Sequence, residues 1–177
     1  HHSTYFRDDI VFVYNSLLYA DNLEIHHLDH PSLFTYFLFS ISYKIFHLIG
    51  FINFSGLEGF LNSENIELSL NKLFYISRLT IQVISLLTIY LFYEIISKYS
   101  KNNFISFLIS IIFIFTIGFV SASNRIESGL ISLFLLIVGF YFFLKFIKNS
   151  SYTGLIYFTI TFIFIFSARS EEHTSEL

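Results

Sequence analysis

Three runs of about twenty apolar residues, followed by a shorter fourth, constrain the fold of this chain more than any other feature. They cover residues 73–96, 104–122, 128–147 and 153–168. An α-helix needs about 20 such residues to cross the hydrocarbon core of a bilayer. The chain is also 54% hydrophobic and only 13% charged, which leaves too little polar surface to cover a core in water. We therefore expect a polytopic membrane protein.

The apolar runs are expected to be helices, although they are rich in β-branched and aromatic residues that favour strands in water. Inside a bilayer every backbone N–H and C=O must find a partner within the protein, which excludes an open sheet. The alternating pattern of a membrane barrel is missing as well. The predicted fold class is therefore all-α.

The lysines between the runs predict the orientation of the chain. Segments 97–103 and 145–150 each carry two lysines, which places both on the cytoplasmic side by the positive-inside rule. Segments 52–72 and 123–127 then lie on the opposite, external side. The expected location is a bacterial inner membrane, with the functional face periplasmic or extracellular.

Residues 32–51 allow two interpretations. They are long enough to span, but they contain Lys44 and His47, and a charge at mid-membrane costs roughly 2.5–3.5 kcal/mol. A spanning helix would leave residues 1–30 in the cytoplasm. A helix lying in the interface would instead make residues 1–72 one external region, and the charges favour this second arrangement.

Charged and imidazole side chains gather ahead of the apolar runs. Asp8 and Asp9 could provide a general base or bind a divalent cation, or they could be solvated loop acids. The segment HHLDHP, which contains His30, could bind a metal ion or be a polar loop at the lipid surface. Pro31 is suited to the first turn of the helix that follows.

Two further segments place charge at the mouths of membrane helices. Arg125 and Glu127 precede the run at 128–147 and could pair with each other, or Arg125 could bind a phosphate. Arg78 lies near the start of the run at 73–96, where it could contact a headgroup or extend to the interface. We find no nucleotide-binding motif and no basic cluster for nucleic acid. No nucleotide cofactor and no nucleic-acid partner are expected, and the chain has no cysteine.

Taken in order, these residues resemble the GT-C class of membrane glycosyltransferases, in particular the protein O-mannosyltransferase and aminoarabinose-transferase type of glycosyltransferase family 39. The family pattern begins with an acidic pair, here Asp8 and Asp9. A Tyr follows about ten positions later, here Tyr19, and a His-Pro pair about twenty positions later, here His30 and Pro31. A helix along the membrane comes next.

The second half of the resemblance concerns the membrane helices. An Arg that opens the second span corresponds to Arg78, and an acid in a short external loop before the fourth span corresponds to Glu127. The chain departs from the family in having Asp at position 9, HPS in place of HPP, and Glu at position 127. The resemblance covers residues 7 to about 168 and implies an N-terminal GT-C domain that is inactive alone.

The resemblance implies inverting transfer of a sugar from a polyprenyl-phosphate donor to a hydroxyl of a protein, lipid or glycan. Asp8 or Asp9 would be the base, with His30, Glu127, Arg125 and Arg78 near the phosphate or a divalent metal ion, whose involvement stays open. A polytopic transporter and a surface-polysaccharide polymerase or ligase are the alternatives.

Both ends of the sequence suggest a piece of a longer chain. The sequence contains no Met, and residues 169–177, RSEEHTSEL, resemble the translated start of a common sequencing adapter. We expect this tail to be an artefact. Without it the formal net charge changes from −3 to −1.

Overall fold

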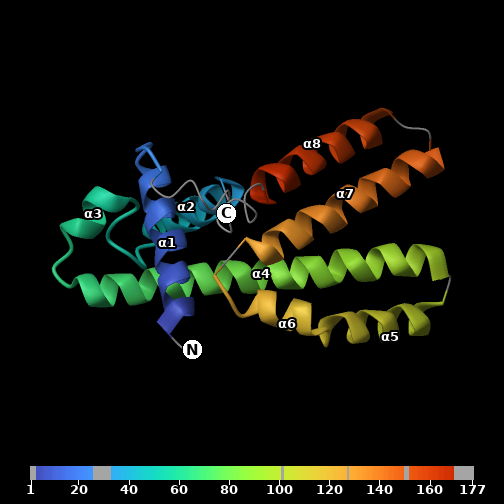
Figure 1. The fold of residues 1–177 in the computed structure, drawn as a ribbon, viewed down its shortest axis with the longest axis horizontal. Coiled ribbons are helices and arrows are strands. Elements are labelled where there is room, and N and C mark those ends of the chain that lie inside the picture. The colour runs from blue at the N-terminus through green and yellow to red at the C-terminus, as the bar shows by residue number, and fades with distance from the viewer. Residues whose placement is uncertain (1–2, 26–32, 101, 127, 150–151, 170–177) are drawn as a thin grey trace, which may run out of the picture. The chain divides into compact units, whose positions relative to one another are not determined.

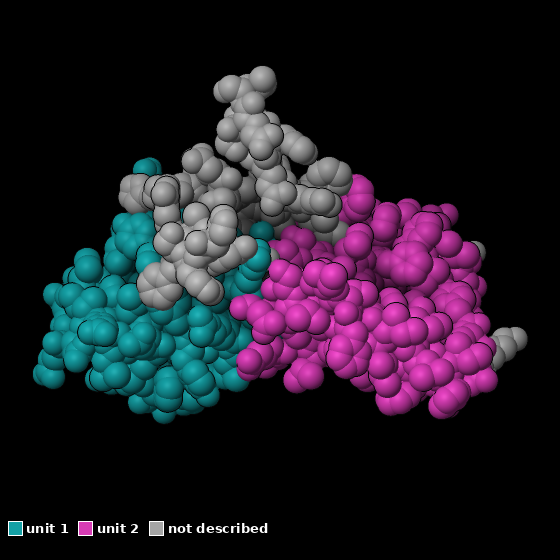
Figure 2. Space-filling model, turned by 60° about the horizontal axis from the view of Figure 1, so that its bottom comes forward, with its two compact units in different colours: residues 1–81, 125–128, 167–177 teal, residues 82–124, 129–166 magenta. Residues whose placement is uncertain are grey.

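The computed structural model describes residues 3–25, 33–100, 102–126, 128–149 and 152–169, and the side chains of 3–8, 149 and 165–169 are not described. These residues form helices α1 to α8 without a strand, which confirms the all-α prediction for the described part of the chain (Figure 1). The chain divides into two compact units, and the boundary between them falls within α4 after Ile81 (Figure 2).

Unit 1 comprises residues 1–81, 125–128 and 167–177. It contains α1 (Ser3–Ala20), α2 (Leu33–Leu48), α3 (Leu57–Leu61) and the first part of α4 (Ile66–Ser100). Unit 2 comprises residues 82–124 and 129–166. It contains the rest of α4, with α5 (Asn103–Ile114), α6 (Ile117–Ser123), α7 (Gly129–Asn149) and most of α8 (Tyr152–Arg169).

The two helices α1 and α2 end in the same way, with a residue in the left-handed conformation. Gly50 has φ +78°, and the N–H of Phe51 bonds to the carbonyl of Phe46 at 2.9 Å. Asn22 has φ +56°, and the N–H of Leu23 bonds to the carbonyl of Leu18 at 2.9 Å. Both are Schellman ends, in which a 6→1 bond satisfies a terminal carbonyl. The expected segment 32–51 therefore contains a helix of 16 residues that stops at Leu48.

Helix α4 is longer than the run that predicted it. Its 35 residues span about 52 Å at 1.5 Å per residue, against about 30 Å of hydrocarbon. The Asn65 side chain caps its start, accepting from the N–H of Leu68 at 3.0 Å. The helix therefore begins before the apolar run at 73–96, and its first turns carry Glu67 and Lys72.

Among the described residues, two helices, α4 and α7, are long and apolar enough to cross a membrane, and a third span is possible if α5 and α6 count as one. The axes of α5 and α6 meet at an angle of 64°, whereas the sequence predicted a single span over 104–122. Thr116 explains the break, because its hydroxyl accepts from the N–H of Phe119 at 3.4 Å and so starts a new helix. The described apolar part of α8, Tyr152–Phe164, is shorter.

Candidate functional site

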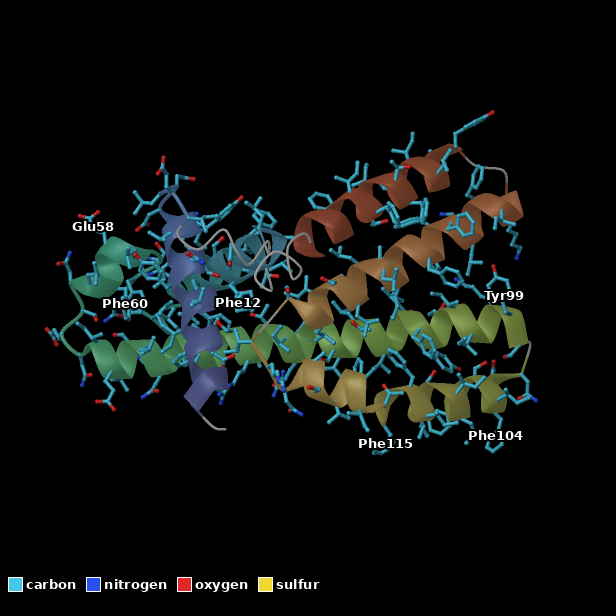
Figure 3. The ribbon with its side chains drawn as sticks, viewed as in Figure 1. Phe12, Glu58, Phe60, Tyr99, Phe104 and Phe115 are labelled. Carbon is cyan, nitrogen blue, oxygen red and sulfur yellow. The ribbon has the colours of Figure 1, made fainter. Side chains whose placement is uncertain are left out.

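The acidic pair lies on the first half of α1. The side chain of Asp8 is outside the described residues, and Asp9 is half-buried. Asp9 shares a face of α1 with Phe12, Val13 and Ser16, which follow at helical spacing and are all buried. Figure 3 labels Phe12 on this helix. Asp9 therefore lies on a packed helix and not in a loop, as one of the two interpretations of the sequence had it.

Arg125 lies in the connection between α6 and α7, and its side chain is half-buried. Residues 125–128 group with unit 1, although the chain on both sides of them belongs to unit 2. Ile126 anchors the segment with no exposed surface. Neither Arg125 nor Asp9 is without an interaction partner. Asp9 and Arg125, 116 positions apart in the sequence, are thus members of the same compact unit.

Arg78 is exposed on α4. Its neighbour Ser77 has no exposed surface, and its hydroxyl lies 2.7 Å from the Tyr43 hydroxyl of α2. Arg78 follows Tyr75, which is 58% exposed, by three positions and so shares its helix face. Arg78 is therefore in unit 1 but is not part of the contact between α2 and α4.

His30 and Glu127 lie outside the described residues, as does the whole segment HHLDHP. Within the described ranges, no group of three or more His, Asp or Glu side chains could hold a metal ion. The involvement of a divalent ion therefore stays a prediction of the sequence.

The sequence did not reveal a buried polar group between α1 and α2. Asn15 and Thr35 have no exposed surface, and the amide nitrogen of Asn15 donates to the Tyr36 hydroxyl at 3.3 Å. The carbonyl oxygen of Asn15 and the hydroxyl of Thr35 have no hydrogen-bond partner among the described residues. Unsatisfied buried groups of this kind cost about 1–3 kcal/mol each. In the sequence, these two residues are marked only by being polar within otherwise apolar helices.

A polar hollow of about 380 Å³ lies at the other end of α1. Asp21, His47 and Glu58 line it, and Figure 3 labels Glu58 on α3. Asp21 accepts from the N–H of Glu58 at 3.1 Å and so caps α3, and His47 Nδ1 lies 3.2 Å from the Ile52 carbonyl oxygen. Since Asp21 follows Asp9 by twelve helical positions, about 18 Å along the axis, this hollow is separate from the acidic pair.

Burial and hydrogen bonding distinguish the two groups of polar residues. Those around Asp21 hold the chain turns in place, whereas Asp9 lies at the edge of the buried face of α1. The described part of unit 1 therefore contains a carboxylate, Asp9, and a guanidinium, Arg125, from distant parts of the sequence. Comparison of the chain with family models, curated proteins and solved structures finds no match.

Proposed function

We propose that this chain belongs to an enzyme that transfers a sugar from a polyprenyl-phosphate donor to a hydroxyl acceptor at the outer face of the membrane. The acceptor would be a protein, lipid or glycan, and the membrane a bacterial inner membrane with the reaction on its periplasmic or extracellular side. The type of reaction is the one that the GT-C resemblance implies, and its site would lie in unit 1.

One observation carries the proposal. Residues 125–128 group with the first 81 residues and not with the helices on either side of them. A reaction centre built from the acidic pair and the loop before the expected span at 128–147 requires such a grouping. The grouping supports the proposal through Asp9 and Arg125, while Glu127 lies outside the described residues.

The chemistry of a lipid-linked donor fits a site at the mouth of membrane helices. The polyprenyl tail stays in hydrocarbon, while the sugar and its phosphate lie at the bilayer surface. Helix α2 has 16 residues, which span about 24 Å and so fall short of about 30 Å of hydrocarbon. Its length suits a helix along the interface, which would hold α1 and Asp9 near the donor's phosphate.

In the proposed step, the carboxylate of Asp8 or Asp9 takes the proton from the acceptor hydroxyl. The acceptor oxygen attacks the anomeric carbon from the face opposite the phosphate, forming the new glycosidic bond with inversion. The bond from the anomeric carbon to the phosphate oxygen breaks, and its electron pair leaves with polyprenyl phosphate. Arg125 or Arg78, with His30 and Glu127 nearby, would stabilise the charge that grows on that phosphate.

The activity test uses the intact gene product in membrane vesicles with radiolabelled polyprenyl-phosphate mannose as the first probe. We expect either Asp8→Asn or Asp9→Asn to lower transfer by roughly 10²–10⁴-fold, the contribution of a general base. Glu24→Gln is the matched control, because Glu24 is an exposed acid beyond the end of α1. Full transfer by both Asn variants would dismiss the assigned base.

A topology test addresses the shared site without requiring activity. The chain has no cysteine, so Asp9→Cys and Glu127→Cys each introduce a single thiol. A membrane-impermeant maleimide should label both from the same side of sealed vesicles, and should label Lys148→Cys only from the other side. Labelling of positions 9 and 127 from opposite compartments would rule out a common reaction centre.

The bend between α5 and α6 favours transport as a second candidate function. Discontinuous membrane helices are common at the binding sites of transporters, where they occur in paired repeats. The described residues contain one such bend, and the sequence shows no internal repeat. Uptake of a solute into vesicles that is unchanged by Asp8→Asn and Asp9→Asn, with no sugar transfer, would favour this candidate.

A further inference from the structure

A cavity of about 490 Å³ lies between the C-terminal parts of α4 and α7, within unit 2. Its polar lining comes from three lysines and two tyrosines, and Ile95, Leu144 and Ile147 supply an apolar wall. The polar residues are Lys98, Tyr99, Tyr141, Lys145 and Lys148. The proposed sugar transfer uses none of these residues.

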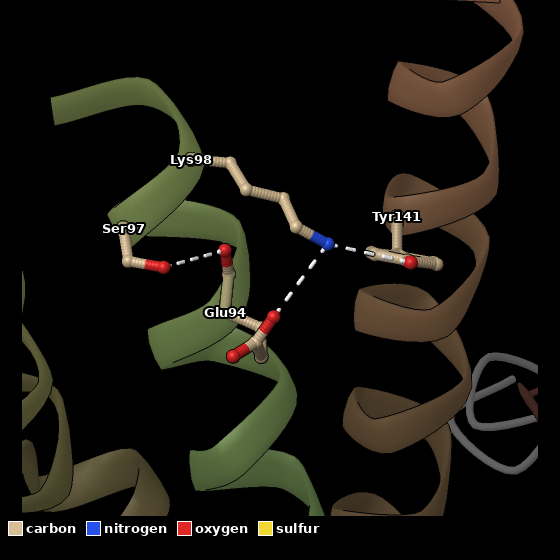
Figure 4. Close-up of polar contacts among 4 residues, drawn as sticks. All are labelled: Glu94, Ser97, Lys98 and Tyr141. Atoms are coloured by element: carbon tan, nitrogen blue, oxygen red, sulfur yellow. Dashed lines mark hydrogen bonds and ion pairs between the residues drawn. The ribbon is translucent and has the colours of Figure 1, made fainter. Parts of the chain in front are cut away.

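Helix geometry places these side chains on facing surfaces. Tyr141, Lys145 and Lys148 follow one another at i, i+4 and i+7 and therefore share one face of α7. Lys98 extends from α4 toward that face, with its Nζ 3.4 Å from the Tyr141 hydroxyl and 4.7 Å from the centre of the Tyr141 ring. Figure 4 shows this contact between the two helices.

The positive charge of the cavity is only partly compensated. Lys98 Nζ lies 3.5 Å from a carboxylate oxygen of Glu94, one turn earlier on α4. Lys145 and Lys148 are exposed, and no acidic side chain among the described residues lies within ion-pair distance of them. None of the residues that line the cavity is acidic. The cavity therefore carries a net positive charge beside an apolar wall.

We propose that this cavity binds an anionic phospholipid of the cytoplasmic leaflet, with the headgroup phosphate on the lysines and the acyl chains against the apolar wall. Basic pockets between membrane helices on the cytoplasmic side suit anionic headgroups, because ammonium groups donate to phosphate oxygens and anionic lipids concentrate in that leaflet. Tyr99 and Tyr141 suit the same depth, since amphipathic rings prefer the membrane interface. The proposal does not depend on sugar transfer.

The binding test uses the 177-residue chain in dodecyl maltoside micelles, with phosphatidylglycerol as the anionic probe and native mass spectrometry as the readout. We expect one retained phosphatidylglycerol and little retained phosphatidylcholine. Lys145→Gln with Lys148→Gln should weaken retention by roughly fivefold for each lysine removed. Lys145→Arg with Lys148→Arg preserves the charge and should preserve binding.

The control pair Lys44→Gln with Lys72→Gln removes the same charge from unit 1 and should leave retention unchanged. An equal loss in both Gln pairs would show general charge attraction and overturn the proposal, as would equal retention of phosphatidylcholine. Inorganic phosphate added at the lipid's concentration should not displace it. Displacement by inorganic phosphate would identify a site for a free anion and would also overturn the proposal.

Discussion

The two units satisfy their buried polar groups in different ways. In unit 1, some hydroxyls bond back to their own helix, as Ser16 does to Phe12, but the pairs Asn15 with Tyr36 and Tyr43 with Ser77 join one helix to another. In unit 2, most hydroxyls bond back to their own helix, as Thr88 does to Ile84 and Ser110 does to Ser106. Aromatic rings then join the helices of unit 2, for example Phe92 with Phe113 at 4.3 Å and Phe142 with Tyr157 at 4.9 Å between ring centres.

Both units contain buried apolar side chains, such as Leu130 of unit 2, and exposed ones, such as Leu48 of unit 1, so the comparison is between single positions. Phe39 and Tyr43 of unit 1 have no exposed surface, so unit 1 has a closed core. In unit 2, Ile117 is 89% exposed and Phe115 76% exposed, and Figure 3 labels Phe104 on α5 and Phe115 just after its end. Contact of such an apolar surface with lipid tails costs no free energy, whereas its exposure to water is unfavourable. Phe39 therefore lies in a closed core, whereas Phe115 and Ile117 lie on a surface that lipid tails could cover.

The largest expected effect on the free energy of unfolding comes from removing a large side chain from the core of unit 1. We expect Phe39→Ala to lower the free energy of unfolding by about 3–5 kcal/mol, because it leaves a cavity in a closed core. Phe115→Ala should change it by less than about 0.5 kcal/mol, since the side chain contacts lipid or detergent. Unfolding by SDS in dodecyl maltoside micelles measures both, and equal losses would abolish the distinction between the units.

Glycine substitutions test the packing at one position in each unit, with a smaller effect. A Cβ on Gly56 would overlap the Asp21 carboxylate that caps α3. We expect Gly56→Ala to destabilise the chain by about 1–3 kcal/mol. Gly118→Ala in α6 is the control, because a Cβ there meets no atom within 4 Å, and it should be neutral or stabilising by up to about 1 kcal/mol. Thermal unfolding in micelles compares them, and a stable Gly56→Ala variant would contradict the packing around Asp21.

Single hydroxyls give the next test. Tyr43→Phe should cost about 1 kcal/mol, because it removes a hydrogen bond between α2 and α4 and leaves Ser77 without that partner. Ser110→Ala should cost less than about 0.5 kcal/mol, since its hydroxyl bonds only within α5. A double-mutant cycle with Ser77→Ala measures the coupling energy between the two hydroxyls. A coupling energy near zero would show that they act independently and would contradict the interhelix hydrogen bond.

The smallest expected effect is a pH dependence at high pH. Burial raises the pKa of Tyr43, and the hydrogen bond with Ser77 opposes this only in part. Unfolding lets the phenol ionise near its ordinary pKa of about 10, so its contribution to stability is complete below that pH and is lost as the pH rises above it. The chain should therefore lose more stability than its Tyr43→Phe variant between pH 9 and pH 11, measured at about the same ionic strength. Parallel pH profiles would exclude this effect.

The candidate site could be predicted only in part. Its residue types could be read from the sequence, because carboxylates and arginines are conspicuous in a chain with 13% charged residues. Their grouping was expected only from the GT-C resemblance and the loop charges, since no local pattern links residues 125–128, which lie between segments of unit 2, to the first 81 residues. The cap on α3 from Asp21 was missed, because it joins positions 37 apart in the sequence.

The sequence by itself determined that the chain is helical and contains segments able to cross a membrane. The reason is local: a backbone in hydrocarbon must satisfy its own hydrogen bonds, so about twenty apolar residues specify a helix wherever they occur. The tertiary structure decided which polar groups share the core of unit 1, how far α4 extends before its apolar run, and where α5 bends into α6. These features depend on how each helix is rotated and which helix it contacts. A few side-chain interactions decide between the alternative arrangements, and hydrophobic periodicity does not encode those interactions.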